Sequence, residues 1–250
     1  MQHHNLILKN VSYGFLGGPL LIQELTLHIQ ASSYVILVGP NGSGKSTLFS
    51  LLRGQLHPST GSIHVGGKNV SDLRLKERGR LIASVTQNPL KGTFAHMSLY
   101  ENLAFAERRG RMFSLKPLRL KTRKAAFQEH LRLLGMGLED RLEDLAGSLS
   151  GGQQQALSLA MATFCDAQVL LLDEPTAALD PAMAERIMEM TQTLRQRKEL
   201  TMLMVTHNLD HALRFGDRLL FWQGGQVRHD FDGSAKQALT RRDLETFFKI

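Results

Sequence analysis

Short apolar runs recur along the chain, with glycine, proline and serine between them. Three early runs alternate with polar residues or stay apolar over a few positions, and we expect them to form an antiparallel region: residues 6–8, 25–29 and 63–65. Three other runs are continuously apolar, as strands buried on both faces of a parallel sheet are: residues 34–38, 169–172 and 202–205. The pattern therefore predicts two kinds of strand pairing in one chain.

Helical periodicity fills the intervals between the buried runs. Asp180 and Pro181 form a typical N-cap and first-turn pair, and apolar residues then recur on one helical face at Met183, Ile187, Met190 and Leu194. Similar spacing predicts helices near residues 127–134 and 157–164. Buried strands that alternate with helices favour an α/β fold with a mainly parallel sheet. A helix-rich segment at about residues 91–165 falls outside this scheme and is predicted to be an insertion.

Composition narrows the classes of partner. The net charge is +7 and the isoelectric point is near 9.8, which favours an anionic neighbour: a nucleotide, a nucleic acid or an anionic membrane surface. No apolar run approaches the roughly 20 residues that a membrane-spanning helix needs. Cys165 is the single cysteine, which excludes an internal disulfide and fits a reducing compartment.

A glycine-rich segment follows the buried run 34–38 and precedes a helix-like stretch. Its residues are Gly39, Pro40, Asn41, Gly42, Ser43, Gly44, Lys45, Ser46 and Thr47. They match G-x-x-x-x-G-K-[ST] in the strand-to-helix setting that this motif requires. In such a loop the backbone N–H groups point at phosphate oxygens. We expect Lys45 to reach the β- and γ-phosphates of a nucleotide and the Ser46 hydroxyl to bind Mg²⁺.

Two acids follow the buried run 169–172. Ligands of a parallel sheet lie at the carboxyl ends of its strands, so Asp173 and Glu174 should face the glycine-rich loop. Asp173 would hold Mg²⁺ directly or through water, and Glu174 would act as general base toward the attacking water. An acidic turn after a core strand is common, and it is the presence of Lys45 that favours the catalytic interpretation.

A further string carries a family resemblance. Residues 148–153 read Ser-Leu-Ser-Gly-Gly-Gln, which resembles the LSGGQ signature of ABC ATPases. The resemblance covers residues 5–250 and implies a single cassette, with a P-loop NTPase core, an N-terminal antiparallel β subdomain and an inserted helical subdomain. It also implies that the signature, Ser150, Gly151, Gly152 and Gln153, lies at a helix N-terminus and contacts the γ-phosphate of ATP held by an opposite subunit. Two identical chains would then form a head-to-tail homodimer in the ATP-bound state.

Four more positions resemble motifs of this family and occur in the family's order. Tyr13 resembles the aromatic residue that stacks on adenine, and Gln87 resembles the Q-loop glutamine that senses Mg²⁺ and the attacking water. Asp180 resembles the last residue of the D-loop, and His207 resembles the switch histidine that contacts the γ-phosphate. The set implies an active ATPase that uses ATP and Mg²⁺.

The resemblance leaves several functions to weigh. A single cassette without a membrane span favours the energy-coupling subunit of a transporter, peripheral on the cytoplasmic face of the inner membrane, with integral permease subunits and a separate solute-binding protein. An exporter or a lipid-transport ATPase is an alternative. Ribosome-acting relatives usually carry two cassettes, and DNA-maintenance relatives need a long heptad insertion, so no specific nucleic acid is expected. An intact Glu174 argues against a non-catalytic binding module.

Finer resemblances concern the cargo. Residues 88–94, 98–104, 134–142 and 155–163 resemble a bacterial subfamily commonly assigned to importers, some of them proposed to carry tryptophan or tyrosine. This implies import of a small solute, with an aromatic amino acid as one candidate. The basic stretch 107–124 is open to three interpretations: contact with anionic lipid, contact with RNA, or a solvated surface.

Overall fold

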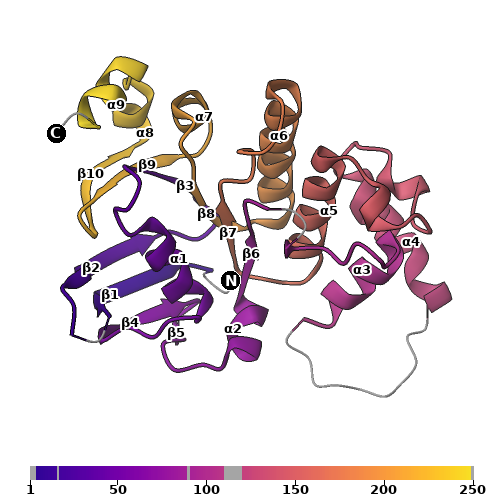
Figure 1. Cartoon of the computed structure of the whole chain (residues 1–250), viewed down its shortest axis with the longest axis horizontal. Helices are drawn as coiled ribbons and strands as arrows, with labels where there is room; N and C mark the ends of the chain where they lie inside the picture. The colour runs from indigo at the N-terminus through magenta and orange to yellow at the C-terminus, as the bar shows by residue number, and fades with distance from the viewer. Residues whose placement is uncertain (1–3, 16, 89–90, 110–119, 249–250) are drawn as a thin grey trace.

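A computed structural model describes residues 4–15, 17–88, 91–109 and 120–248, so residues 110–119 of the basic stretch lie outside it. The first of its two sheets is antiparallel, in the order β2-β1-β4-β5 (Figure 1). Its strands are β1 (Leu6–Gly14), β2 (Leu20–Ile29), β4 (Thr60–Val65) and β5 (Lys68–Asn69). The antiparallel start predicted from the early apolar runs is confirmed.

The second sheet has the order β10-β9-β3-β8-β7-β6. Its strands are β3 (Tyr34–Val38), β6 (Ile82–Val85), β7 (Val169–Asp173), β8 (Thr201–Val205), β9 (Arg218–Gln223) and β10 (Gln226–Asp232). All neighbouring pairs are parallel except β9 and β10, which form an antiparallel hairpin. The predicted parallel sheet is therefore confirmed, and the short β6 is an addition that the apolar pattern did not indicate.

Helices cover both faces of this sheet. Those outside the segment between β6 and β7 are α1 (Lys45–Arg53), α2 (Leu75–Leu81), α6 (Pro181–Lys198), α7 (Leu209–Arg214), α8 (Gly233–Gln237) and α9 (Arg241–Phe247). The Asp180 side chain caps α6 by accepting a hydrogen bond from the Met183 N–H at 3.0 Å, as the sequence predicts. No helix of the described residues is both long and apolar enough to cross a membrane.

The segment between β6 and β7 is helical. It contains α3 (Leu99–Glu107), α4 (Leu120–Arg132), two short 3₁₀ turns, η2 (Leu138–Asp140) and η3 (Ala146–Ser148), and α5 (Gly151–Phe164). These helices pack on one another and gather on one side of the molecule, away from the antiparallel sheet (Figure 1). This arrangement agrees with a helical insertion, whose limits at residues 91 and 165 stay a prediction.

The parallel sheet separates two apolar cores. Along β3, Tyr34, Ile36 and Val38 face the core that contains α5 and α6. Val35 and Leu37 face the core formed by α1 and the antiparallel sheet. This alternation explains why the run 34–38 is apolar at every position, since both sides of the strand are covered.

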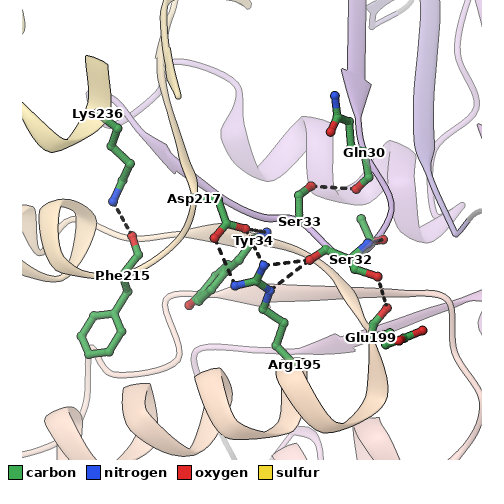
Figure 2. A network of polar contacts seen from close by, with 10 residues as sticks. Gln30, Ser32, Ser33, Tyr34, Arg195, Glu199, Phe215, Asp217 and Lys236 are labelled. Carbon is green, nitrogen blue, oxygen red and sulfur yellow. Dashed lines mark hydrogen bonds and ion pairs between the residues drawn. The ribbon is translucent and has the colours of Figure 1, made fainter. Parts of the chain in front are cut away.

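A polar network fixes the start of β3 (Figure 2). The Asp217 carboxylate accepts a hydrogen bond from the Tyr34 N–H at 2.8 Å and pairs with the Arg195 guanidinium at 2.7 Å. Arg195 in turn donates to the Ser32 carbonyl at 2.9 Å. The network ties α6 and the start of β9 to the amino end of β3, and β3 leads at its other end into the glycine-rich loop.

Candidate nucleotide-binding site

Most of the residues predicted to act on a nucleotide follow four neighbouring strands. β3, β8, β7 and β6 lie side by side in that order and run parallel, so their carboxyl ends meet at one edge of the sheet. The glycine-rich loop follows β3, His207 follows β8, and Gln87 follows β6. Asp173 ends β7 and Glu174 comes next. The topology thus brings together segments that are far apart in the sequence.

The glycine-rich loop is curled back on itself between β3 and α1. Gly42 and Gly44 have φ angles of 74° and 100°, a region that glycine enters without the steric cost of a Cβ. Gly44 is also the N-cap residue of α1, whose first N–H groups have no partner within the helix. A loop of this shape ahead of a helix N-terminus suits a phosphate.

Lys45 lies along the inside of this loop. Its ammonium donates to the carbonyls of Gly39 and Pro40, each at 2.7 Å, and the residue is only 6% exposed. Burial lowers the pKa of Lys45 below its ordinary value, while the carboxylates of Glu174 and Asp173 act in the opposite direction. The lysine is therefore held where a phosphate oxygen can replace the two carbonyls as its partner.

The loop and the strand ends enclose a cavity of about 220 Å³. The residues that line it are Leu21, Asn41, Gly42, Ser43, Gly44, Lys45, Ser46, Thr47, Asp173, Glu174, Val205 and His207. Most of the predicted phosphate, metal and catalytic residues therefore share one space. Gly39 and Pro40 contribute through the carbonyls that hold Lys45.

The cavity also provides oxygen ligands of the kind that Mg²⁺ prefers. Ser46, which carries a hydroxyl, and Asp173, which carries a carboxylate, belong to its lining. Mg²⁺ usually completes its octahedral shell with phosphate and water oxygens. Within the described part of the chain, no group of three or more His, Cys, Asp or Glu residues could hold a metal. These donors fit a Mg²⁺ ion that arrives with a nucleotide rather than one bound by protein ligands alone.

Glu174 is held by its backbone and by its side chain. Its φ is 50°, an uncommon angle for a residue with a Cβ, and its N–H donates to the Val205 carbonyl at 3.0 Å. The carboxylate Oε1 lies 2.7 Å from His207 Nε2. Backbone strain of this kind persists where the surrounding structure fixes the residue, and here it places the carboxylate in the cavity wall.

Comparison with known proteins identifies the family. Residues 22–177 match the family model described as ABC transporter. The chain belongs to the ABC transporter family. It is an ATP-binding cassette and an ATPase. A tyrosine transport ATP-binding protein of Clostridioides difficile is 38% identical to this cassette, over 96% of each chain. A thiamine import ATP-binding protein of Photorhabdus laumondii is 35% identical over 90% of the cassette and 89% of its own length.

A solved structure supports the same assignment. A dimeric ATP-binding cassette in a post-hydrolysis state with ADP and phosphate is 26% identical and superposes with a TM-score of 0.74, covering 91% of this chain and 98% of that one. Some other relatives are longer: the cassette spans 60% of an Fe(3+) import ATP-binding protein of Rhizobium meliloti. The predicted fold class, a P-loop ABC ATPase, is confirmed.

The ABC signature lies apart from this cavity. Ser150 is the N-cap of α5 and forms a capping box with Gln153. Gly151 is exposed, and no atom beyond its chain neighbours and its own helix backbone lies within 4 Å of the place a Cβ would take. Gly152 is buried against Met183. No residue of 150–153 is among the lining residues of the cavity. The signature therefore offers its helix N-terminus to solvent in the single chain.

The prediction for Tyr13 is not supported. Tyr13 is 8% exposed, packs in the core of the antiparallel sheet and contacts Phe15 edge to face at 5.4 Å. A ring so covered offers little surface to an adenine base, and the predicted role of Tyr13 stays a prediction. Phe15, by contrast, is 61% exposed. Gln87 is exposed beyond β6 and is not among the cavity's lining residues, so its predicted role stays a prediction.

Two residues at the site were missed from the sequence. Arg53 pairs with Asp173 at 2.9 Å from the last turn of α1, and Trp222 on β9 donates to the Ser43 carbonyl of the glycine-rich loop at 2.7 Å. Arg53 follows Lys45 by about two helical turns, which is a weak signal at best. For Trp222 no local signal exists, because it is separated from Ser43 by 179 residues.

Proposed function

We propose that this cassette energises the import of a small solute across a membrane through separate permease subunits. The observation that carries the proposal is the cavity in which Lys45, Asp173, Glu174 and His207 meet, in a chain similar over 96% of its length to a transport ATP-binding protein. The relative named for thiamine import supports the direction of transport. The cassette would lie on the cytoplasmic face of the membrane, where ATP is available.

Each residue of the cavity has a proposed role in hydrolysis. Lys45 and the N–H groups of residues 41–47 bind the phosphates. Ser46 and Asp173 would hold Mg²⁺, which supplies positive charge to the phosphate oxygens. Glu174 accepts the proton of the attacking water, and His207, already 2.7 Å from that carboxylate, keeps it oriented. Gln87 is proposed to reach the metal and the water when the site closes.

For stacking on the adenine base of ATP, we propose Phe15 in place of Tyr13. Phe15 directly follows β1, whose last residue is Gly14, and its ring is 61% exposed. It lies on the connection to β2, the strand that supplies Leu21 to the cavity wall. Stacking on an exposed aromatic ring suits adenine because it needs a free π-face and no specific hydrogen bond.

ATP hydrolysis is proposed to need a second copy of the cassette. Ser150, Gly151, Gly152 and Gln153 lie outside their own cavity, and the N-terminus of α5 carries the partial positive charge that attracts a phosphate. A head-to-tail homodimer would place this end of α5 against the γ-phosphate of the partner, with Asp180 at the same interface. The related cassette solved as a dimer with ADP and phosphate supports this arrangement.

An exposed apolar patch is the proposed contact for the permease. We define the helical patch as Phe94, Met97, Phe105 and Leu145, which are 39–57% exposed. The rings of Phe94 and Phe105 lie 4.6 Å apart, and the backbones at Met97 and Leu145 are tied together by the Ala146 N–H bond to the Met97 carbonyl. Apolar side chains gathered on a surface in this way mark protein contacts, and two residues of the patch, Phe94 and Met97, follow Gln87 closely in the sequence.

Tyrosine, or a related aromatic amino acid, is the proposed cargo. The support is the relative named for tyrosine transport, which is 38% identical over nearly the whole cassette. A separate solute-binding protein would deliver the cargo. An exporter or lipid-transport ATPase is the alternative, and the relatives named for import speak against it.

The test is reconstitution of the transporter. The cassette is co-expressed with a candidate permease and a candidate solute-binding protein, and uptake of labelled tyrosine into proteoliposomes containing ATP is measured. We expect uptake with the native cassette and none with Glu174→Gln, and excess thiamine should not compete. Movement of labelled tyrosine out of ATP-loaded vesicles would overturn the proposed direction of transport. Competition by thiamine would overturn the proposed cargo. A Phe105→Glu variant should keep ATP binding and lose binding to the permease. This variant tests the helical patch separately.

A further inference from the structure

Trp222 touches the glycine-rich loop at three places. Its indole N–H donates to the Ser43 carbonyl at 2.7 Å. Its own carbonyl lies so close to Gly39 that a Cβ there would be 2.0 Å from the oxygen. A Cβ on Gly44 would be 3.6 Å from the indole nitrogen. Trp222 is fully buried and is the single tryptophan of the chain.

The Ser43 carbonyl needs these contacts because of how the loop works. When backbone N–H groups turn inward toward a phosphate, some carbonyls of the loop turn outward and must find donors elsewhere. The Ser43 carbonyl accepts from Trp222 and also from the Gly225 N–H at 3.2 Å. Leucine or phenylalanine at 222 would fill space but could not donate, since the indole N–H is what supplies the hydrogen bond.

The turn after β9 strengthens the same contact. A Cβ on Gly225 would be 2.1 Å from the Leu21 carbonyl, so the turn between β9 and β10 is pressed against β2 at a residue that lines the cavity. The loop is thus held between β9, its following turn and β2. β9 also pairs directly with β3, where Val38 lies opposite Phe221. The strand that carries Trp222 is therefore hydrogen-bonded to the strand that leads into the loop.

We propose that Trp222 is a positioning residue for the phosphate loop: its indole N–H keeps the Ser43 carbonyl turned out of the cavity, so that the loop is shaped for phosphate before the nucleotide arrives. A loop ordered in advance loses less freedom on binding, and this raises affinity without adding a contact to the ligand. The indole also lies close enough to the loop to sense its occupant. Trp222 therefore reports nucleotide binding through its own fluorescence.

The experiment compares two substitutions on one strand. Trp222→Phe removes the donor and keeps an aromatic ring. Phe221→Leu alters the neighbouring buried aromatic, whose ring faces the other core and packs against Phe247 and Phe248. Dissociation constants for a fluorescent ADP analogue are measured without Mg²⁺, together with thermal unfolding. We expect Trp222→Phe to weaken ADP binding about three- to tenfold, as for loss of one buried hydrogen bond, and Phe221→Leu to leave it within about twofold while also lowering the unfolding temperature.

A second measurement uses the native chain and needs no variant. Its single indole N–H gives one resonance in a ¹⁵N spectrum, which should exchange slowly with D₂O and shift when ADP is added, and the tryptophan emission should change over the same titration. Equal ADP affinity in Trp222→Phe and the native chain, or an indole signal unchanged at saturating ADP, would overturn the proposal. Failure of the native chain to bind ADP would instead refute the site at Lys45, so the two ideas fail separately.

Discussion

Arg53 and Asp173 form an ion pair between the end of α1 and the end of β7, with guanidinium Nη2 2.9 Å from carboxylate Oδ2. Both side chains are largely covered, at 16% and 25% exposure, and the guanidinium also lies over the Phe49 ring at 5.4 Å. The carboxylate proposed to hold Mg²⁺ is thus already partly neutralised by a cation of the same helix that carries Lys45.

We therefore predict that Arg53 limits the affinity of the site for Mg²⁺. In Arg53→Met, removal of a positive charge near the metal position should lower the Mg²⁺ concentration needed for half-maximal ATP binding by about three- to tenfold. The measurement is a Mg²⁺ titration of a fluorescent ATP analogue, with Arg74→Met, away from the cavity, as control. A higher Mg²⁺ requirement in Arg53→Met would show instead that the arginine orients Asp173 for the metal.

Lys45 allows a prediction with a closely matched control. Lys45→Ala removes the charged donor proposed for the phosphates and should weaken ATP binding about 100-fold. Lys236 is a second buried lysine, 5% exposed. It too donates to two carbonyls, that of Phe215 (Figure 2) and that of Leu213. Lys236→Ala should destabilise the fold to a similar extent and leave ATP affinity unchanged. Calorimetric titration and thermal unfolding of both variants check this, and equal loss of affinity in both would count against a specific role for Lys45.

Local patterns explain which parts of this fold the sequence predicts. β3, β7 and β8 each show an unbroken apolar run because both faces of the parallel sheet are covered. The glycine-rich loop is also local, since Gly42 and Gly44 take backbone angles that few other residues allow. The ion pair of Arg53 with Asp173 joins residues 120 positions apart. Local sequence patterns do not predict a contact of that kind.

The difference in exposure between Tyr13 and Phe15 has a specific physical cause. Residues two apart on a strand share a face, so Tyr13 and Phe15 appear equivalent in the sequence. β1 ends at Gly14, and its pairing with β2 shifts register on both sides of Tyr13. Tyr13 therefore remains within the sheet and its core, whereas Phe15 leaves the strand and becomes exposed. Only the strand boundary distinguishes the two aromatics.

The buried side chain of His130 allows a prediction of how the unfolding free energy depends on pH. The ring is buried beside Phe164 on α5, Nε2 donates to the Ala160 carbonyl at 3.0 Å, and burial, with a smaller contribution from the Lys198 ammonium of α6, lowers its pKa from 6.5 to about 4. A lowered pKa means that the unfolded chain takes up the proton first. The stability that neutral His130 contributes to the folded chain is therefore complete above pH 6.5, and it is lost as the pH falls toward 4.

The expected loss from His130 is about 2 kcal/mol of unfolding free energy at pH 5 relative to pH 7. In His130→Gln this part of the acid destabilisation should disappear, while His28→Gln, at an exposed histidine, should behave as the native chain does. Urea unfolding at pH 7 and pH 5 provides the three comparisons. A native-sized acid effect in His130→Gln would assign it to other groups.

The open surroundings of Gly151 allow the proposed dimer to be tested without damage to the single chain. In the described structure, apart from its chain neighbours and the nearby backbone of its own helix, no atom lies within 4 Å of the position of a Cβ on Gly151. A Cβ on Gly152, by contrast, would be 2.3 Å from Met183. Gly151→Ala should therefore leave the unfolding free energy unchanged or raise it by up to about 1 kcal/mol, because alanine favours the helix. ATP binding to the monomer should also be unchanged, since Gly151 does not line the cavity.

If the end of α5 closes on a partner's γ-phosphate, the added methyl group of Gly151→Ala should abolish ATP-dependent dimers. It should also reduce hydrolysis at least about 100-fold, like the loss of one pre-organised donor from an active site. Dimers are measured by light scattering in a Glu174→Gln background, which should hold ATP without hydrolysing it, and Gly79→Ala on α2, where the nearest atom is 3.9 Å away, is the control. Dimers and hydrolysis that survive Gly151→Ala would mean that the signature does not meet ATP across the interface.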